Sequence, residues 1–505
     1  MLTKVEARDI RIGMFVAELD RPWTDTPFLL QGFLVEDEKQ VEQLRSFCKF
    51  VNVDRMRSVE GVFPEHRDLT PRPSRTMPPG SRKTISPGSA PSTRRPAAPG
   101  GLSEREALIL DVIEELGPRS KTVFESSAGS VEYAQPGLLG FLKDQVSNLF
   151  RRGGGEPAPK YRNATKREQP EAAEDAARKP VHHDFIPPSI NLRFHPETKT
   201  IEEEMPEARQ AFTQVEELSR QLIDDLHSGR LFSVDEVEEI IDDVVGSALR
   251  SPDALMLVTR LKQHDVAIYG HSLQVAVYLV ALGRHLGLPS EDLARLAMLG
   301  LFLDLGKTKV PATLLSKPGR LTPDEFNLVK QHVSLGVDLI HKVPGLDPKI
   351  LEGVAQHHER EDGSGYPAGL RAEGISLYGR MAGIVDTFVA LTNPRPYEAA
   401  ISAYEALRKI SDLGGSLFHP PLVEQFVQTV GVFPVGSRVE LSTGEIAIVI
   451  RQSSVRRLKP KVLVLTGPDK VPVSNPTTLD LLYQADGNEP VHILRGLPAG
   501  SFGRV

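Results

Sequence analysis

Apolar residues recur at a helical spacing through the middle of the chain. From about residue 200, an apolar stripe with a repeat near 3.6 residues runs through IEEEMPEARQAFTQVEELSRQLIDDLHSG and ends at Gly229, a residue suited to a helix C-terminus. A second amphipathic stretch, SVDEVEEIIDDVVGSAL, begins at Ser233, and helical spacing continues to about Val430. This pattern predicts that the main domain is all-α.

The two ends of the chain instead show patterns typical of strands. Near the N-terminus, RIGMFVAEL and CKFVNVD are rich in β-branched and aromatic residues, and the stretch between them places Val41, Leu44 and Phe47 on one helical face. Near the C-terminus, SRVELSTGEIAIVIRQ alternates around a Thr-Gly turn, and KPKVLVLTG is another strand-like run. We predict a small α+β domain at the first end and a small β-barrel or three-stranded module at the second.

Segments rich in Pro, Ser, Gly and Arg separate these units. Such a segment buries too little apolar surface to offset the entropy lost on ordering, so we interpret it as a disordered linker, interrupted by one helix at LSEREALILDVIEEL. The fold class is therefore mainly α. The predicted units are a small α+β N-terminal domain (1–62), a largely disordered linker with a short helix (63–199), connecting helices (200–250), a helical domain (251–430) and a small β module (431–505).

Composition narrows the class of protein. The chain has 505 residues and a net charge of −7, with Lys and Arg spread widely, so we expect no DNA partner. Cys48 is its single cysteine, which excludes an internal disulfide and suits a reducing cytosol. The N-terminus lacks the apolar core of a signal peptide, and the apolar run from Leu273 to Leu286 is shorter than the ~20 residues that a membrane span needs. We expect a cytoplasmic protein with no membrane span.

Several histidines and aspartates lie among apolar neighbours in the helical domain. They are His271, Asp304, His332, His357, His358 and Asp386. A mixed set of nitrogen and oxygen ligands suits borderline divalent metals such as Fe, Mn, Zn or Ni. A carboxylate can also bridge two ions about 3.5–4 Å apart, which together activate water for attack on phosphorus.

Each of these residues has a plainer explanation when it is taken alone. A single histidine on an apolar helix is more often a hydrogen-bonded core residue. Asp304 could pair with Lys307 three residues later, and Asp386 could be a buried hydrogen-bond acceptor. Buried aspartates are rare unless they are paired or bound to metal, so the joint pattern favours a metal site.

The stretch QHHEREDGSGYPAGL resembles the signature of HD-GYP proteins, a group of HD-superfamily metal phosphohydrolases that hydrolyse cyclic di-GMP. Four further stretches occur in the family's order and spacing, over roughly residues 250 to 430. They are YGHSLQVA, LGKTKVPATLLSKPGRLTPDEF, QHVSLG and GRMAGIVDTFVALTNPRPYEAA. The N-terminal unit, with RIGMFVAELDRPW and PFLLQGF, resembles a small domain found in one branch of this family. The resemblance implies an HD-type helical domain, cyclic di-GMP as the ligand and two sites for divalent ions such as Fe or Mn.

The resemblance also implies roles for individual residues. It places the six histidines and aspartates at metal-ligand positions, with Asp304 bridging the two ions and also catalytic. Lys307 would be catalytic and bind substrate, because it supplies positive charge near the attacked phosphorus. Arg395 in NPRPY would contact a phosphate, a task suited to its planar fork.

The GSGYP loop would contribute to substrate binding. The residues that would bind substrate are Gly365, Tyr366 and Pro367, and Gly363 belongs to the same loop. Gly-Ser-Gly permits a tight turn. Tyr366 is as well suited to a functional role, in stacking or partner contact, as to a plain structural role in the turn. Arg360 and Asp362 would brace the loop, which is also a candidate contact for diguanylate cyclase domains.

The sequence departs from the family at the histidine of the HD pair, because Leu303 precedes Asp304. Leucine has no lone pair and cannot bind a metal. The resemblance therefore implies that one metal site is compromised, with His271, Asp304 and Asp386 as its remaining protein ligands. The other site would keep Asp304 and the histidines around it.

Three further positions depart from the family pattern. Glu398 stands where the family usually has Arg or Lys, and its carboxylate would repel substrate phosphates. His419 stands where the family usually has Asp. Ala267 offers no carboxylate to support a third metal.

These departures leave two functional hypotheses. In the first, the chain is a cyclic di-GMP signalling protein with weakened or lost catalysis, which recognises the nucleotide or a partner such as a diguanylate cyclase domain. In the second, it is an active phosphodiesterase that cleaves the 3′–5′ phosphodiester bond with a dinuclear centre, water filling the open position. A scaffold without ligand is disfavoured because the other ligand positions are intact. The helices at 200–250 suit either intrachain packing or a homodimer.

Overall fold

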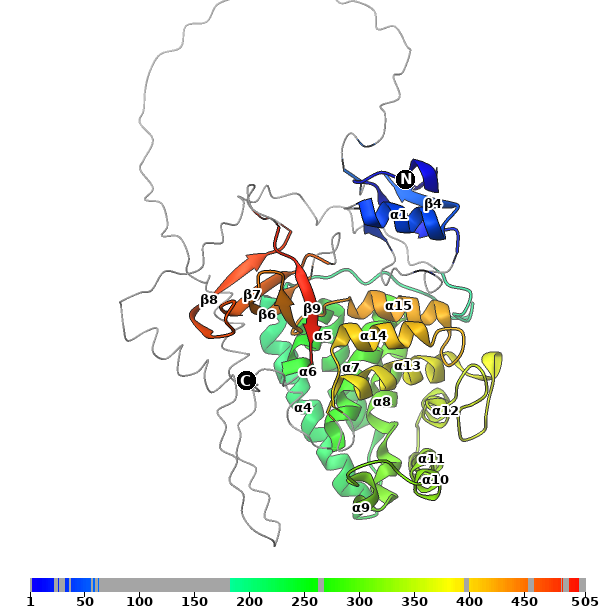
Figure 1. Cartoon of the computed structure of the whole chain (residues 1–505). Coiled ribbons are helices and arrows are strands. Elements are labelled where there is room, and N and C mark those ends of the chain that lie inside the picture. The colour runs from blue at the N-terminus through cyan, green and yellow to red at the C-terminus, as the bar shows by residue number, and fades with distance from the viewer. Residues whose placement is uncertain are drawn as a thin grey trace, which may run out of the picture.

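The computed structural model describes part of the chain. The described residues are 2–21, 26, 32–35, 38–55, 58–59, 62, 182–261, 268–394, 399–452, 458–482, 484 and 490–498. The linker predicted from residue 63 onward lies outside them as far as residue 181, as do the helix predicted within it, Ala267, Arg395 and Glu398. The described fold is mainly α with a small sheet near each end of the chain, as predicted (Figure 1). No helix in these described ranges is both long and apolar enough to span a membrane.

The N-terminal unit is a four-stranded antiparallel sheet with one α-helix. Its elements are β1 (Leu2–Glu6), the 3₁₀ turn η1 (Ala7–Asp9), β2 (Phe15–Leu19), β3 (Phe33–Leu34), α1 (Glu38–Phe47) and β4 (Phe50–Asp54), with the strand order β1-β4-β2-β3. Val41 and Leu44 are buried on the inner face of α1, as predicted, but Phe47, its last residue, is 38% exposed. The unit has an apolar core of its own.

The helical domain contains the elements that position the candidate site. They are α4 (Ile201–His227), α5 (Val234–Arg250), α6 (Pro252–Leu261), α7 (Ile268–His285), α8 (Ser290–Phe302), η5 (Leu305–Lys309), α9 (Ala312–Leu315), α10 (Pro323–Lys330), α11 (His332–Ile340), α12 (Pro348–Gln356), η6 (Ala372–Gly374), α13 (Leu377–Thr392), α14 (Ala403–Asp412) and α15 (Pro420–Val430).

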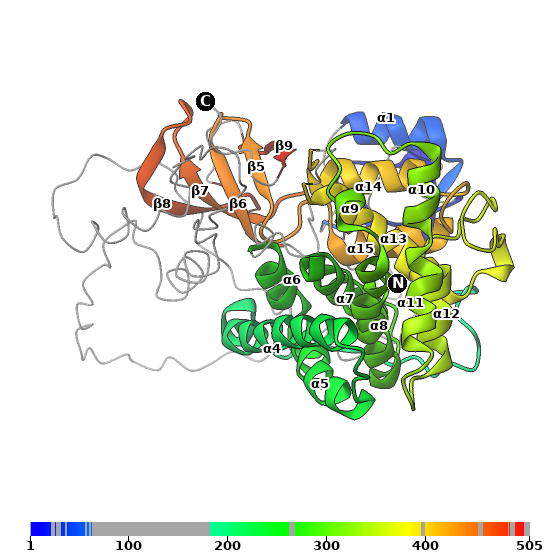
Figure 2. The ribbon, with the colours of Figure 1, turned by 90° about the horizontal axis from the view of Figure 1, so that it is seen from below.

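Helix α7 lies at the centre of this domain and contacts α4, α5, α6, α8, α13 and α15 (Figure 2). Its apolar run is buried, so it is a core helix, as the sequence indicated. Gly300 of α8 permits close approach, because a Cβ there would lie 2.3 Å from Ala276 Cα of α7. Helices α4 and α5, predicted to be connecting helices, bury their apolar stripes in the same core as the rest of the domain. They are therefore an integral part of its packing.

The segment 182–199, here called the strap, was assigned to the linker but is packed against the helical domain (Figure 1). Ile186 is only 1% exposed within the main core. The Arg193 N–H donates to the carbonyl of Gly287 at 2.7 Å. A few spaced apolar residues anchor this otherwise polar, proline-containing segment, and they carry too little periodicity to be recognised in the sequence. The linker boundary at residue 199 is therefore corrected.

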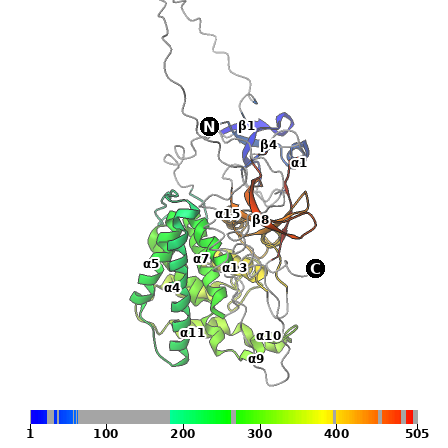
Figure 3. The ribbon, with the colours of Figure 1, turned by 90° about the vertical axis from the view of Figure 1, so that its left-hand side faces the viewer.

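The described C-terminal unit is an antiparallel sheet of five strands, so the three-stranded prediction was wrong, and the barrel stays a prediction. Its strands are β5 (Arg438–Leu441), β6 (Ile446–Arg451), β7 (Lys461–Thr466), β8 (Pro472–Asp480) and β9 (Ile493–Leu497), in the order β8-β7-β6-β5-β9. The predicted hairpin joins β5 to β6, with Gly444 at φ +98°. The sheet has its own apolar core, and β9 contacts α14. Figures 1 and 3 show α9, α10 and α11 at the end of the helical domain away from this sheet.

Candidate metal centre

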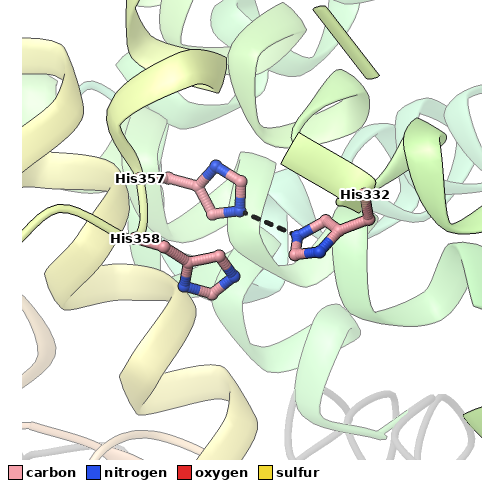
Figure 4. Close-up of side chains that lie close together, drawn as sticks. All are labelled: His332, His357 and His358. Atoms are coloured by element: carbon pink, nitrogen blue, oxygen red, sulfur yellow. Dashed lines mark hydrogen bonds between the residues drawn. The ribbon is translucent and has the colours of Figure 1, made fainter. Parts of the chain in front are cut away.

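Three histidine side chains converge beside α11 and α12 (Figure 4). His332 is the first residue of α11, and His357 and His358 directly follow α12. One ring nitrogen from each lies within 4.8 Å of the others. Because the first residue of α11 and the turn at the end of α12 supply the three rings, the packing of these two helices holds the cluster together.

Backbone carbonyls fix the orientation of two of these rings. His332 Nδ1 lies 2.7 Å from the Val329 carbonyl, and His357 Nδ1 lies 2.7 Å from the Val354 carbonyl. A carbonyl only accepts, so each Nδ1 donates and each neutral ring keeps a lone pair on Nε2. These two Nε2 atoms face each other at 3.4 Å. Two lone pairs cannot share a hydrogen bond, whereas a cation between them satisfies both, and ring–carbonyl bonds of this kind orient metal-binding histidines.

Burial keeps these histidines neutral. Desolvation lowers the pKa of His357 to about 4 and also lowers the pKa values of His332 and His358. The positive charge that His357 would carry lowers the pKa of His358 further. Neutral imidazole is the form that binds metal, so the electrostatics and the geometry agree.

The predicted aspartates lie next to this cluster. Asp304 Oδ1 is 3.6 Å from His332 Nε2, and Asp304 Oδ2 is 2.6 Å from Lys307 Nζ. The Asp304–Lys307 pair considered as a plainer explanation is therefore present in the structure. Asp386 Oδ1 is 2.7 Å from His271 Nε2, which itself lies 3.9 Å from Asp304 Oδ2. The structure thus brings the predicted histidines and aspartates together around one centre.

The surroundings of both buried carboxylates favour the ionised form. Burial by itself raises the pKa of Asp304, but Lys307 and then His271 outweigh it and hold that pKa below its usual range. Burial likewise raises the pKa of Asp386, and the hydrogen bond from His271 brings it well below its usual value. An ionised carboxylate only accepts hydrogen bonds, so His271 Nε2 donates to Asp386 in this arrangement.

Leu303 occupies the position next to Asp304 at the end of α8. Its side chain is fully buried and belongs to the apolar core of the helical domain. Within the described ranges, the cluster of His332, His357 and His358 is the only group of three or more His, Cys, Asp or Glu side chains that is compact enough to hold an ion. The three-histidine set therefore fits a metal, whereas Leu303 supplies no donor atom on the side of the centre that faces His271 and Asp386.

Glycine 306 fixes the distance between the aspartate turn and α11. A Cβ at this position would lie 1.9 Å from the His332 carbonyl oxygen and 2.5 Å from the Gly336 amide nitrogen. Only glycine fits such an approach. The close approach of Gly306 therefore places the neighbouring Asp304 and Lys307 next to the helix that begins at His332.

The GSGYP loop folds back over the histidine cluster. Gly363 adopts a positive φ of +76°, and a Cβ on Gly365 would lie 2.5 Å from the His358 carbonyl oxygen. The Tyr366 ring lies 4.6 Å from the His358 ring, with 31° between their planes. Pro367, the next residue, is exposed. The glycines thus allow the approach that brings Tyr366 onto a candidate ligand.

Sequence reasoning missed the residue that holds the far side of this loop. Buried Glu359 accepts hydrogen bonds from the N–H groups of Ala368, Gly369 and Leu370 at 2.7, 3.1 and 2.9 Å. The Arg360 guanidinium donates to the carbonyls of His357 and Glu359, so it holds the start of the loop. Asp362 accepts from the Ser364 N–H at 2.9 Å, an interaction local to the turn. The sequence signal that could have identified Glu359 was an acidic residue next to a glycine-rich loop, whose backbone N–H groups need acceptors.

Comparison with known proteins identifies the family of this chain. The HD domain family model matches residues 256–422, and the Domain of unknown function (DUF3391) model matches residues 2–129. The cyclic di-GMP phosphodiesterase PA4108 of Pseudomonas aeruginosa is 32% identical over 336 residues, which cover 66% of this chain and 80% of that protein. The chain belongs to the HD-GYP family.

Other relatives match the chain over shorter lengths. A cyclic di-GMP phosphodiesterase of Thermotoga maritima is 32% identical over 181 residues, 35% of this chain and 48% of that protein. The response regulator RpfG of Xanthomonas campestris, a cyclic di-GMP phosphodiesterase, is 36% identical over 148 residues, 29% of this chain and 39% of that protein. A solved HD-GYP-type structure, Bd1817 of Bdellovibrio bacteriovorus, aligns with a TM-score of 0.35 and 16% identity, covering 45% of this chain and 70% of that one.

Membership of the HD-GYP family makes this a metal-dependent type of site. The three-histidine cluster supplies the donor set that such a site needs. The relatives' names support a signalling role connected with cyclic di-GMP.

Proposed function

We propose that this HD-GYP protein is a cyclic di-GMP signalling protein that binds the nucleotide but hydrolyses it weakly. The observation that carries the proposal is the environment of Leu303, whose side chain is fully buried in the apolar core beside Asp304. Hydrocarbon stands where the family pattern has an imidazole. The phosphodiesterase names of the relatives support cyclic di-GMP as the ligand.

The proposed centre holds one well-ligated divalent ion, Fe or Mn, and has a compromised second site. His332, His357 and His358 bind the first ion, with Asp304 beside them. Such an ion would polarise a phosphate oxygen and supply a bound hydroxide at neutral pH. The second site would depend on His271, Asp304 and Asp386, and in this structure His271 and Asp386 are bonded to each other.

Lys307 is proposed to stabilise the reacting phosphate. Its ammonium is paired with Asp304 at 2.6 Å but is not fully buried, so it can contact an anion without losing this partner. Gly365, Tyr366 and Pro367 are proposed to bind the substrate on the loop side. Arg395 is proposed as a phosphate contact.

An active phosphodiesterase with a dinuclear centre is the second candidate. Its support is the name of PA4108, which this chain matches over 80% of that protein's length, and the proximity of all the remaining ligand residues. Metal sites also tolerate open positions filled by water. Residual turnover by this route is compatible with the geometry.

The test compares the wild-type chain with Leu303→His, and with Leu303→Met as an apolar control. Metal content per chain and cyclic di-GMP turnover are measured with added Mn²⁺ or Fe²⁺. We expect about one ion per wild-type chain, a higher content in Leu303→His, and turnover at least about 10-fold lower in wild type than in that variant. Equal turnover would overturn the weakened-enzyme proposal in favour of the second candidate. Absence of both metal and nucleotide binding would indicate a scaffold.

Asp304→Asn tests the metal centre itself, with the exposed Asp338→Asn on α11 as the matched control. The amide keeps the shape but loses the charge that faces Lys307 and the ligand cluster. We expect any wild-type turnover to vanish in Asp304→Asn and to persist in Asp338→Asn. An unchanged rate in Asp304→Asn would mean that the centre is not where the chemistry takes place.

The loop and the long helices are also proposed as contacts with other chains. Pro367 and Ala368 are exposed at the tip of the GSGYP loop, which could contact a diguanylate cyclase domain. Homodimerisation through α4 and α5 is less favoured, because their apolar stripes pack within the chain. Co-sedimentation with a purified diguanylate cyclase domain and measurement of molar mass in solution test these two contacts.

A further inference from the structure

Helix α10 presents an aromatic side chain that the core does not use. Phe326 is 45% exposed, and none of the residues of α10 is buried. The helix is stabilised locally instead, by the capping box between Thr322 and Glu325 and by the ion pair of Lys317 with Glu325 at 2.6 Å. Apolar packing therefore does not explain why Phe326 stands at this position.

The exposed ring belongs to a row of rings that begins at the histidine cluster. The Tyr366 ring packs on His358 at 4.6 Å, and the Phe326 ring lies 6.4 Å beyond it, nearly perpendicular at 83°. Lys330 lies close to both rings, with its Nζ 4.7 Å from the centre of the Phe326 ring and 5.3 Å from that of the Tyr366 ring. An aromatic and cationic surface thus extends outward from His358.

The same helix is tied to the candidate metal centre. Val329, between Phe326 and Lys330, accepts the hydrogen bond from His332 Nδ1 at 2.7 Å. Helix α11 begins at His332, two residues after α10 ends, and Figure 2 shows α10 beside α11. The positions of Phe326 and Lys330 are therefore fixed relative to His332, a proposed metal ligand.

We propose that Phe326, Lys330 and Tyr366 form a binding site for one base and the adjoining phosphate of a cyclic dinucleotide. This inference rests on the proposed function and assigns a subsite to it. A purine can stack on an aromatic ring whatever its edge pattern, and a cation over the same rings attracts the neighbouring phosphate. The nucleotide would thus extend from the histidine cluster onto α10.

A protein partner is the other occupant to consider for these side chains. The nucleotide is favoured because the Lys330 ammonium lies close to both rings. The Tyr366 ring also contacts His358, a proposed metal ligand. Leu328, the other strongly exposed apolar residue of α10, is two positions from Phe326 and so about 200° around the helix. The apolar surface at the site is therefore narrow, as suits one base rather than a domain.

The experiment measures cyclic di-GMP binding to the full chain in the presence of Mn²⁺ by calorimetry. Phe326→Ala is expected to weaken binding by about 5- to 100-fold, and Phe326→Tyr, which keeps a ring, to restore it. Lys330→Met is expected to weaken binding and to reduce its salt dependence, because one phosphate contact is lost. Leu328→Ala, with a similar exposure of 47%, is the control and should bind as wild type does.

Each other outcome has a defined meaning. If wild type binds and Phe326→Ala binds equally well, the subsite is wrong while the proposed function stands. If wild type binds no cyclic di-GMP, the proposed function fails and this inference fails with it. If Phe326→Ala loses only the binding of a purified diguanylate cyclase domain, the surface is a protein contact and the nucleotide subsite is overturned. Melting curves check folding, which is expected to persist because α10 contributes no buried residue.

Discussion

Leu303 and Asp304 are neighbours in sequence but lie in opposite environments. Leu303 caps the C-terminus of α8 with its side chain in the apolar core, and Asp304 then leaves helical geometry, at φ −106° and ψ 3°, to reach the histidines. The turn that follows must be compact, because Gly306 approaches α11 so closely. The position of Asp304 beside the histidines therefore depends on a backbone contact as much as on side chains.

Gly306→Ala is expected to destabilise the chain and to lower its metal content. The added Cβ would meet the His332 carbonyl at 1.9 Å, and because both contacting groups are backbone, the turn or α11 must move. We expect a loss of about 3 kcal/mol or more in the free energy of unfolding. Urea unfolding and metal analysis measure the two effects.

Gly374→Ala is the control for that substitution. A Cβ at Gly374 would meet only Leu370 side-chain atoms at 3.8 and 3.9 Å, which is ordinary contact. That variant should match wild type or gain a few tenths of a kcal/mol from a less flexible unfolded chain. If both alanine variants behave alike, the close approach at Gly306 does not matter.

At the scale of elements, the GSGYP loop depends on one buried carboxylate. Glu359→Ala would leave the N–H groups of residues 368–370 without their acceptor. Hydrogen bonds to a charged acceptor are individually strong, so we expect a loss of about 2–3 kcal/mol in unfolding free energy. Amide exchange at these residues should become at least about tenfold faster, as measured by hydrogen–deuterium exchange.

The exposed Glu373→Ala, a few residues from the same loop, is the matched control. It removes the same charge without removing a hydrogen bond to residues 368–370. Fast exchange in both variants would mean that net charge, and not the acceptor at Glu359, keeps the loop ordered.

The N-terminus of α15 carries a titratable group in an apolar setting. His419 precedes Pro420 and contacts the Phe185 ring of the strap at 5.3 Å. Burial, aided by the nearby Arg380, lowers the pKa of His419 to about 4. The unfolded chain, with a histidine pKa near 6.5, therefore binds more protons between about pH 6.5 and pH 4, and stability falls as pH drops through this window.

His419→Gln should flatten that dependence. After allowance for its partial exposure, His419 is expected to account for about 1 kcal/mol of the stability lost between pH 6.5 and pH 4. Urea unfolding at several pH values compares this variant with His341→Gln, which removes an exposed histidine. Equal pH slopes in wild type and His419→Gln would show that His419 does not titrate with folding.

The sequence predicted the elements with strong periodicity and missed those held by tertiary contacts. The apolar stripes of α4 and α5 were visible in the sequence. Their place in the main core was not, because an apolar stripe does not indicate which element it packs against. Strand β8 begins at Pro472 and contains Pro476, so propensity argued against it even though pairing with β7 forms it. The strap was hidden for a related reason, since isolated apolar anchors have no period.

The candidate site was predictable in composition but not in pairing. The six histidines and aspartates stood out as polar residues in apolar helices, and the family resemblance assigned their roles. The hydrogen bond between His271 and Asp386 joins two helices far apart in the chain. The hydrogen bonds from residues 368–370 to Glu359 cross a loop. Neither contact is encoded in a local spacing of residues. The row from His358 to Phe326 likewise depends on how the loop folds over α11.

At the scale of the whole molecule, the described chain has three separate apolar cores. The proposed metal ligands all belong to the helical domain, so metal should stabilise that domain and leave the N-terminal sheet unaffected. Loss of an ion present at 100 times its Kd removes about 2.7 kcal/mol. For a domain of this size, that corresponds to a fall of about 5–10 °C in the melting temperature.

Chelation of the purified chain, followed by calorimetry, measures this fall. Amide exchange at Val51 and Val53 of β4, both buried in the N-terminal core, should not change on chelation, whereas exchange in α11 and α12 should rise. His357→Ala is the control, because a chain that cannot hold the ion should lose nothing further when chelator is added. If the chelator lowers the melting temperature of His357→Ala as much as that of wild type, the stabilising ion binds elsewhere. If it also accelerates exchange in β4, the cores are coupled, and the N-terminal unit would sense the state of the metal centre directly.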